Sequence, residues 1–130
     1  MPELPTVAIV DDDEAVREAL GDLLMVSGLT CHTFAGAASF LSALETRHFD
    51  CLVTDIRMPG MTGIELIEHL RAEGANLPVI VLSSVLDQQA RAYALSLGIG
   101  GWFTKPVSDE RLLGAIAAAI DDGPGSDRRR

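Results

Sequence analysis

Five short apolar segments alternate strictly with five longer segments of helical character along this chain of 130 residues. The short segments have the length and the mostly uncharged interior of strands that are buried on both faces; they span 6–10, 29–34, 51–55, 78–83 and 101–104. In the longer segments apolar residues recur three or four positions apart, as on one face of an amphipathic helix; these span 14–27, 37–46, 63–73, 87–97 and 109–120. Strands joined through helices run parallel. The sequence therefore predicts an α/β fold, a single domain with a five-stranded parallel sheet and helices on both faces.

Length, charge and cysteine content narrow the class of protein further. One domain is predicted over residues 1–121, and the polar segment 122–130, with its Gly and Pro, is predicted to be a flexible tail or the start of an interdomain linker. The net charge of −9 would repel the phosphates of a nucleic acid. No apolar run reaches the ~20 residues of a membrane span, and no export signal opens the chain, so we expect a cytoplasmic protein that binds neither membrane nor nucleic acid. Cys31 and Cys51 stand in strand segments and are expected to be buried thiols.

Acidic, hydroxyl and ammonium groups stand where the predicted strands end. In open parallel sheets, ligands bind outside the carboxyl ends of the strands, at the point where the strand order reverses. For a 2-1-3-4-5 order, the first and third strands are neighbours at that point, which brings Asp11, Asp12 and Asp55 together. The fourth and fifth strands bring Ser83 and Lys105 to the same edge. These five residues form the predicted site.

Three neighbouring carboxylates repel one another, and a hard divalent cation is the simplest compensation. Mg²⁺ prefers oxygen ligands and binds one or two carboxylates together with phosphate oxygens. A carboxylate can attack phosphorus to form an acyl phosphate, while a metal ion and a lysine neutralise charge on the transferred group. Asp55 is therefore predicted to be the nucleophile, and Asp11 and Asp12 to hold Mg²⁺. Lys105 and Ser83 are predicted to contact the phosphoryl oxygens.

Four motifs carry a family resemblance: 10–13 (VDDD), 54–63 (TDIRMPGMTG), Ser83, and the pair Lys105-Pro106. Taken together and in this order, they resemble the receiver domain of bacterial two-component response regulators, over about residues 6–120. The 54–63 segment is the most specific of the four. The resemblance implies a flavodoxin-like fold with strand order 2-1-3-4-5, and a cis peptide bond between Lys105 and Pro106.

The resemblance also implies a reaction. A sensor histidine kinase would transfer a phosphoryl group to Asp55. Mg²⁺ would be bound by Asp12, Asp55 and the main-chain carbonyl of Arg57, with Asp11 helping through water. Lys105 would pair with the phosphoryl group. A receiver is not a turnover enzyme, and at most it slowly hydrolyses its own phosphoryl group.

A switch and an output surface follow from the same resemblance. Ser83 and an aromatic residue, here Trp102, would form the switch; Trp102 stands where receivers more often have Tyr or Phe. The surface expected to change comprises the helix 87–97, the strand 101–104 and the helix 109–120. A partner protein, or a second copy in a homodimer, would bind there.

Several alternatives stay open. A Mg²⁺-dependent aspartyl phosphatase would share the nucleophile, but such enzymes commonly have a carboxylate two residues further on, where this chain has Arg57. A degenerate receiver used only for docking would have lost an acidic residue or the lysine. Within the receiver interpretation, the chain is either a stand-alone receiver acting through protein contacts or the receiver of a transcription regulator, and the 54–63 segment favours the second.

Single residues also have simpler explanations. Asp13, taken alone, is suited to be the N-cap of the helix that begins at Glu14. His32, His48 and His69 lack the paired spacing of a zinc site and are expected to be structural or exposed.

Overall fold

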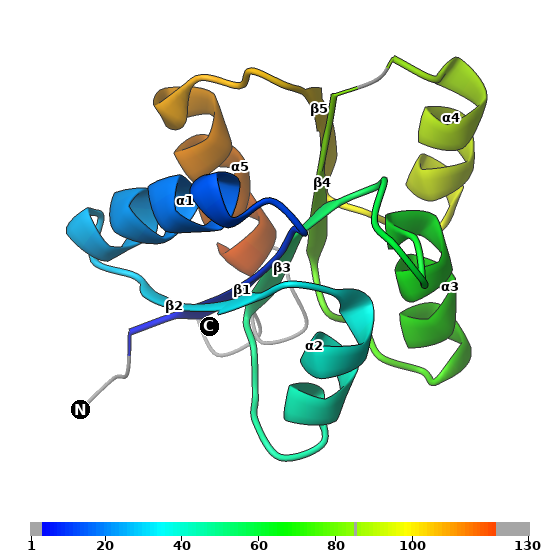
Figure 1. Ribbon diagram of the computed structural model, residues 1–130, viewed down its shortest axis with the longest axis horizontal. Coiled ribbons are helices and arrows are strands. Elements are labelled where there is room, and N and C mark those ends of the chain that lie inside the picture. Colours follow the sequence, from blue (N-terminus) through cyan, green and yellow to red (C-terminus); the bar gives the residue numbers. More distant parts are fainter. Residues whose placement is uncertain (1–3, 85, 122–130) are drawn as a thin grey trace.

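The computed structural model describes residues 4–84 and 86–121, and these residues form one five-stranded sheet with helices on both sides (Figure 1). The strand order is β2-β1-β3-β4-β5, and all four pairings are parallel. The strands are β1 (Thr6–Val10), β2 (Thr30–Phe34), β3 (Cys51–Asp55), β4 (Val79–Ser83) and β5 (Gly101–Thr104). The predicted fold class and strand order are both confirmed.

Five helices connect or follow the strands: α1 (Glu14–Val26), α2 (Ala37–Leu44), α3 (Gly63–Ala72), α4 (Gln88–Ser96) and α5 (Asp109–Asp121). In Figure 1, α1 and α5 cover one face of the sheet, and α2, α3 and α4 cover the other. The observed helix ends differ from the predicted ones by one or two residues. At Ser27 and Glu73 the backbone has already left the helical region, with ψ of 4° and 0°, and each is followed by a glycine with positive φ.

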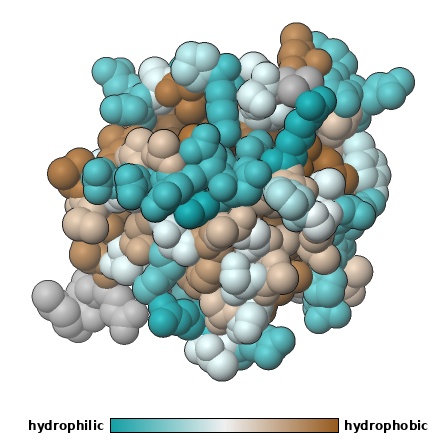
Figure 2. Space-filling view, in the orientation of Figure 1, coloured by the Kyte–Doolittle hydropathy of each residue, from teal (hydrophilic) through white to brown (hydrophobic). Residues whose placement is uncertain are grey.

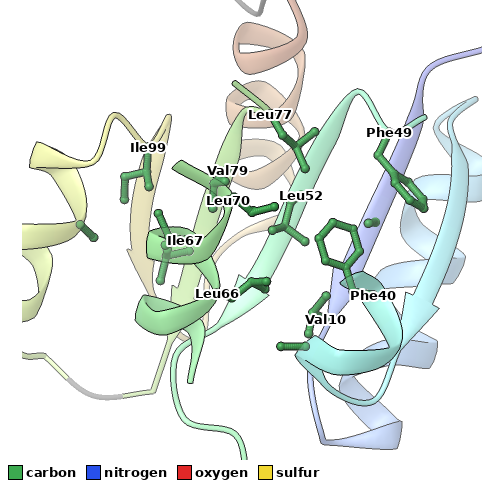
Figure 3. Close-up of a cluster of buried hydrophobic side chains, with 14 of the residues drawn as sticks. Val10, Phe40, Phe49, Leu52, Leu66, Ile67, Leu70, Leu77, Val79 and Ile99 are labelled. Atoms are coloured by element: carbon green, nitrogen blue, oxygen red, sulfur yellow. The ribbon is translucent and has the colours of Figure 1, made fainter. Parts of the chain in front are cut away.

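The core has two layers, one on each face of the sheet. Every residue of β3 and β4 is buried, as expected for strands covered on both sides. Figure 3 shows the layer under α2 and α3, where Phe40 and Leu66 lie against the sheet near Leu52. Burial of each such large apolar side chain contributes about 1.5–3 kcal/mol. These layers fix the positions of the strand ends.

The two cysteines differ in their surroundings. Cys51 is buried, as predicted, and burial raises the pKa of its thiol to about 12. Cys31 lies on the edge strand β2 and is only partly buried, so the prediction of a buried thiol was too strong for this residue. Burial nevertheless raises the pKa of Cys31 to about 11, so both thiols are protonated at neutral pH.

No helix within residues 4–84 and 86–121 is long and apolar enough to cross a membrane. Figure 2, which has the orientation of Figure 1, shows a band of hydrophilic residues in the region where α1 lies in Figure 1. The exposed acidic residues of α1 are Glu14, Glu18 and Asp22. This acidic surface agrees with the negative net charge of the chain.

Candidate functional site

The chain leaves β1 at a carboxylate that is held by main-chain contacts. Asp11 is 2% exposed, and its N–H donates to the carbonyl of Phe34 on β2 (3.1 Å). Its Oδ1 accepts the N–H of Asp13 (2.9 Å). Asp13 Oδ1 in turn accepts the N–H groups of Ala15 (2.9 Å) and Val16 (3.4 Å) and caps α1. The structure supports the N-cap role suggested for Asp13.

β3 ends at Asp55, whose backbone lies directly against the start of α3. Asp55 is 8% exposed, and its Oδ1 accepts the N–H of Ile56 (2.7 Å). Gly63 donates its N–H to the carbonyl of Ile56 (2.9 Å), and a Cβ on Gly63 would lie 2.2 Å from the carbonyl oxygen of Asp55. Only glycine allows this approach of two backbones. Gly63 was not among the predicted site residues; the available signal was its position at the end of the 54–63 motif.

Three carboxylates gather at the carboxyl edge of the sheet. Asp11, Asp12 and Asp55 can each offer one oxygen such that these atoms all lie within 4.8 Å of one another. Asp11 and Asp55 are buried, whereas Asp12 is exposed. The predicted juxtaposition of the ends of β1 and β3 is therefore present in the structure.

Lys105, which follows β5, supplies positive charge to this cluster. Its Nζ lies 3.1 Å from Asp11 Oδ2 and 3.4 Å from Asp55 Oδ2. Burial opposes the charge of the ammonium, but its hydrogen bond with Asp11 and the charges of both carboxylates outweigh that cost and raise the pKa of Lys105. The lysine is therefore charged at neutral pH. The Lys105–Pro106 peptide bond is cis, as the family resemblance implied.

Ser83 and Trp102 lie on adjacent strands beside the cluster. Ser83 is buried at the end of β4, and its carbonyl accepts the N–H of Lys105 (2.7 Å). Trp102 pairs with Val81 in the β4–β5 register, two positions before the pair of Ser83 with Thr104. Trp102 is 9% exposed and packs in the core layer that includes Ala94 of α4. Its indole Nε1 is buried and has no hydrogen-bond partner in the part of the chain that the structure describes.

The donor set of the cluster suits Mg²⁺. Carboxylate oxygens are the hard ligands that Mg²⁺ prefers, and the exposure of Asp12 leaves one side open to the waters that this ion retains. The side chain of Arg57, two residues beyond Asp55, is exposed and adds no carboxylate. The main-chain carbonyl of Arg57 stays a predicted ligand.

Within the described residues, the histidines do not form a comparable group, because Asp11, Asp12 and Asp55 are the one metal-capable cluster there. Both ring nitrogens of His32 lie 3.1 Å from Nη1 of Arg47, and His48 pairs with Asp50 (3.1 Å). His69 is exposed on α3. The expectation that the histidines are structural or exposed is confirmed.

Comparison with known proteins agrees with this geometry. The family model of the response regulator receiver domain matches residues 7–117. Among curated relatives, the chain is similar to the transcriptional regulatory protein FixJ of Azorhizobium caulinodans, with 41% identity over 120 residues, covering 92% of this chain and 57% of the relative. It is also similar to the response regulator protein TodT of Pseudomonas putida, with 38% identity over 118 residues, covering 91% of this chain and 52% of the relative.

Solved structures show the same fold. The crystal structure of FixJ-N has a TM-score of 0.83 at 35% identity, covering 94% of this chain and 97% of that one. Full-length FixJ from B. japonicum has a TM-score of 0.88 at 33% identity, covering 95% of this chain and 61% of that one. The chain thus spans about half the length of the curated relatives it matches. Its motifs, its fold and these matches agree, and the chain belongs to the response regulator receiver domain family.

Proposed function

We propose that this protein is a Mg²⁺-dependent phosphoacceptor switch, in which a sensor histidine kinase phosphorylates Asp55. The observation that carries the proposal is the cluster of three carboxylates, all within 4.8 Å, with the ammonium of Lys105 on two of them. Such a site combines a nucleophile, a place for a divalent cation and a positive charge that can pair with the transferred phosphoryl group.

The chemistry assigned to the chain is one transfer. A carboxylate oxygen of Asp55 attacks phosphorus, a P–O bond forms, and the P–N bond of the donor phosphohistidine breaks. Lys105 already contacts Asp55 Oδ2 and is placed to pair with a phosphoryl oxygen. Asp11, Asp12, Asp55 and the carbonyl of Arg57 would hold Mg²⁺, which when bound neutralises charge on the carboxylates and on the transferred group. Asp12 is exposed, so donor and metal reach the site from solvent on that side.

The proposed output starts at Ser83. Both Ser83 and Trp102 belong to the β4–β5 pair, and strand alternation places them on the same face of the sheet, the face that α4 covers. Drawing the Ser83 hydroxyl toward the phosphoryl group would shift the connection from β4 to α4. The surface of α4, β5 and α5 would then favour a partner or a second copy. Apolar side chains are exposed on α4 at Tyr93 and Leu95.

Trp102 offers a direct readout, because it is the one tryptophan of the chain. Beryllium fluoride with Mg²⁺, a mimic of the phosphoryl group, is expected to change the fluorescence emission of Trp102, since the indole lies in the core layer beside α4. The emission of the Asp55→Asn variant is expected to change no more with beryllium fluoride and Mg²⁺ than it does with Mg²⁺ alone. Equal responses in both proteins would mean that Trp102 senses metal or ionic strength, and the switch role proposed for it would be wrong.

Two further proposals concern the whole protein. FixJ and TodT are a transcriptional regulatory protein and a response regulator about twice as long as the matched region, so we propose that this chain is the receiver of a transcription regulator. Under that proposal residues 1–121 are the receiver, 122–130 begin the linker, and the protein acts in the bacterial cytoplasm, where the DNA is. The segment 122–130 lies outside the described residues.

The aspartyl phosphatase alternative is weakened by the site. The position two residues beyond Asp55 holds an exposed arginine, which cannot serve as the carboxylate acid of that reaction. Steady release of phosphate from a phosphomonoester by the purified protein would restore that alternative. The degenerate receiver is also disfavoured, because all three carboxylates are present within 4.8 Å of one another and the lysine contacts two of them.

A further inference from the structure

Arg17 is a cation at an unfavourable end of a helix. It is the fourth residue of α1, near the N-terminus, where the helix dipole disfavours positive charge. It is half-buried, and its Nη1 donates to the main-chain carbonyl of Asp11 (2.8 Å). The guanidinium thus reaches back along the chain to the residue that follows β1. Nothing in the family motifs or in the proposed reaction uses this contact.

The contact completes a set of four on one residue. The N–H of Asp11 donates to Phe34 on β2 (3.1 Å), and its carbonyl accepts from Arg17 (2.8 Å). Its Oδ1 accepts from the N–H of Asp13 (2.9 Å), and its Oδ2 from Lys105 (3.1 Å). Each polar atom of Asp11 is therefore held from a different direction. Of these four partners, Arg17 is the one that lies within α1, whereas Asp13 is its N-cap.

We propose that Arg17 is a positioning residue for the metal site, holding the bend after β1 so that Asp11 and Asp12 stay within reach of Asp55. The inference rests on the proposed function, since it concerns the site for a divalent cation. Arg17 has two effects of opposite sign on that site. Its hydrogen bond keeps the carboxylates together, which strengthens metal binding, while its positive charge repels a cation, which weakens it. The effect of the hydrogen bond on metal affinity is the larger of the two.

The test measures the affinity of the protein for Mn²⁺, which is added alone. Binding is monitored as the decrease in the electron paramagnetic resonance signal of the free ion. Mn²⁺ takes the same oxygen ligands as Mg²⁺. Arg17→Met keeps much of the apolar stem but removes the donors and the charge, and we expect its affinity to fall about 10-fold, as for other outer contacts of metal ligands. Arg17→Lys can still donate to the Asp11 carbonyl and is expected to bind within about 2-fold of the native protein, because one hydrogen bond and the charge are retained. Arg91→Met removes an exposed arginine on α4 and is the matched control, expected to bind as the native protein does.

The outcomes separate the inference from the proposed function. If Arg17→Met binds Mn²⁺ as tightly as the native protein or more tightly, charge dominates and the positioning role is overturned. It is overturned as well if Arg17→Lys, shown to be folded by circular dichroism, loses as much affinity as Arg17→Met. If the native protein itself binds no Mn²⁺ at this site, as shown by an unchanged response in Asp12→Asn, the proposed metal site fails and the positioning role fails with it.

Discussion

Asn in place of Asp55 is expected to abolish labelling of the protein by acetyl phosphate in the presence of Mg²⁺. The substitution keeps the shape of the side chain, but an amide is not a nucleophile toward phosphorus and carries no charge for the metal. The fold is expected to survive, because Asn can still accept the N–H of Ile56 that Asp55 Oδ1 accepts (2.7 Å). The labelled fraction is measured by intact-mass spectrometry after a fixed time with the donor.

The matched control is Asp13→Asn, which makes the same chemical change two residues from Asp11. Asp13 caps α1 and lies outside the carboxylate cluster, and Asn is an equally good N-cap. This variant is expected to be labelled as well as the native protein. Undiminished, acid-stable labelling of Asp55→Asn would contradict the assignment of Asp55 as the acceptor.

Asn in place of Asp12 is expected to stabilise the metal-free protein while it weakens Mg²⁺ binding and phosphorylation together. The carboxylate oxygens of the cluster lie within 4.8 Å of one another, a separation at which two like charges repel by about 1 kcal/mol in water, and Asp12 is the exposed member of the cluster. Removing its charge should therefore raise the free energy of unfolding by about 1 kcal/mol, measured with urea in the presence of a chelator. The same change removes a ligand, so the stabilisation that Mg²⁺ gives the native protein should largely disappear.

Asp22→Asn serves as the control for this experiment, because Asp22 is an exposed acidic residue of α1 that lies outside the cluster. It is expected to leave both the metal-free stability and the response to Mg²⁺ nearly unchanged. The account would be contradicted if Asp12→Asn were no more stable than the native protein in chelator and kept the full response to Mg²⁺.

These two effects have one physical cause. In a site proposed to hold a cation and a phosphoryl group, carboxylates lie closer together than their like charges alone would favour. Lys105 offsets part of the repulsion through its contacts with Asp11 and Asp55, and the raised pKa of this lysine reflects that pairing. The contacts of Lys105 are with Asp11 and Asp55. The repulsion that remains is therefore that on Asp12.

The sheet and the placement of the site could be predicted from the sequence, because they depend on local pattern. Apolar strands that alternate with amphipathic helices leave few arrangements, and a parallel sheet brings the carboxyl ends of its strands to one edge. Asp11 and Lys105 directly follow β1 and β5, and Asp55 is the last residue of β3, so their meeting required only the strand order. The Asp13 cap was also foreseeable from its position before Glu14.

Contacts between elements could not be predicted in this way. The 2.2 Å that would separate a Cβ on Gly63 from the Asp55 carbonyl depends on how α3 is placed against β3. The bond from Arg17 to the Asp11 carbonyl depends on the direction in which α1 leaves the sheet. Both contacts require tertiary geometry that the local pattern does not contain. Cys31 is a different case: it proved more exposed than its place in a predicted strand suggested, because β2 is an edge strand, as the predicted strand order already implied.

Acceptance of a phosphoryl group by Asp55, in a Mg²⁺-dependent reaction, is the step on which the proposed function depends. It is tested most directly by incubating the native protein with acetyl phosphate, with Mg²⁺ or with chelator, and then reducing the product with borohydride, which converts an acyl phosphate on aspartate into homoserine. Peptide mass spectrometry is expected to find homoserine at position 55, only after incubation with both donor and Mg²⁺. Homoserine at another aspartate, or equal conversion in chelator, would contradict the account.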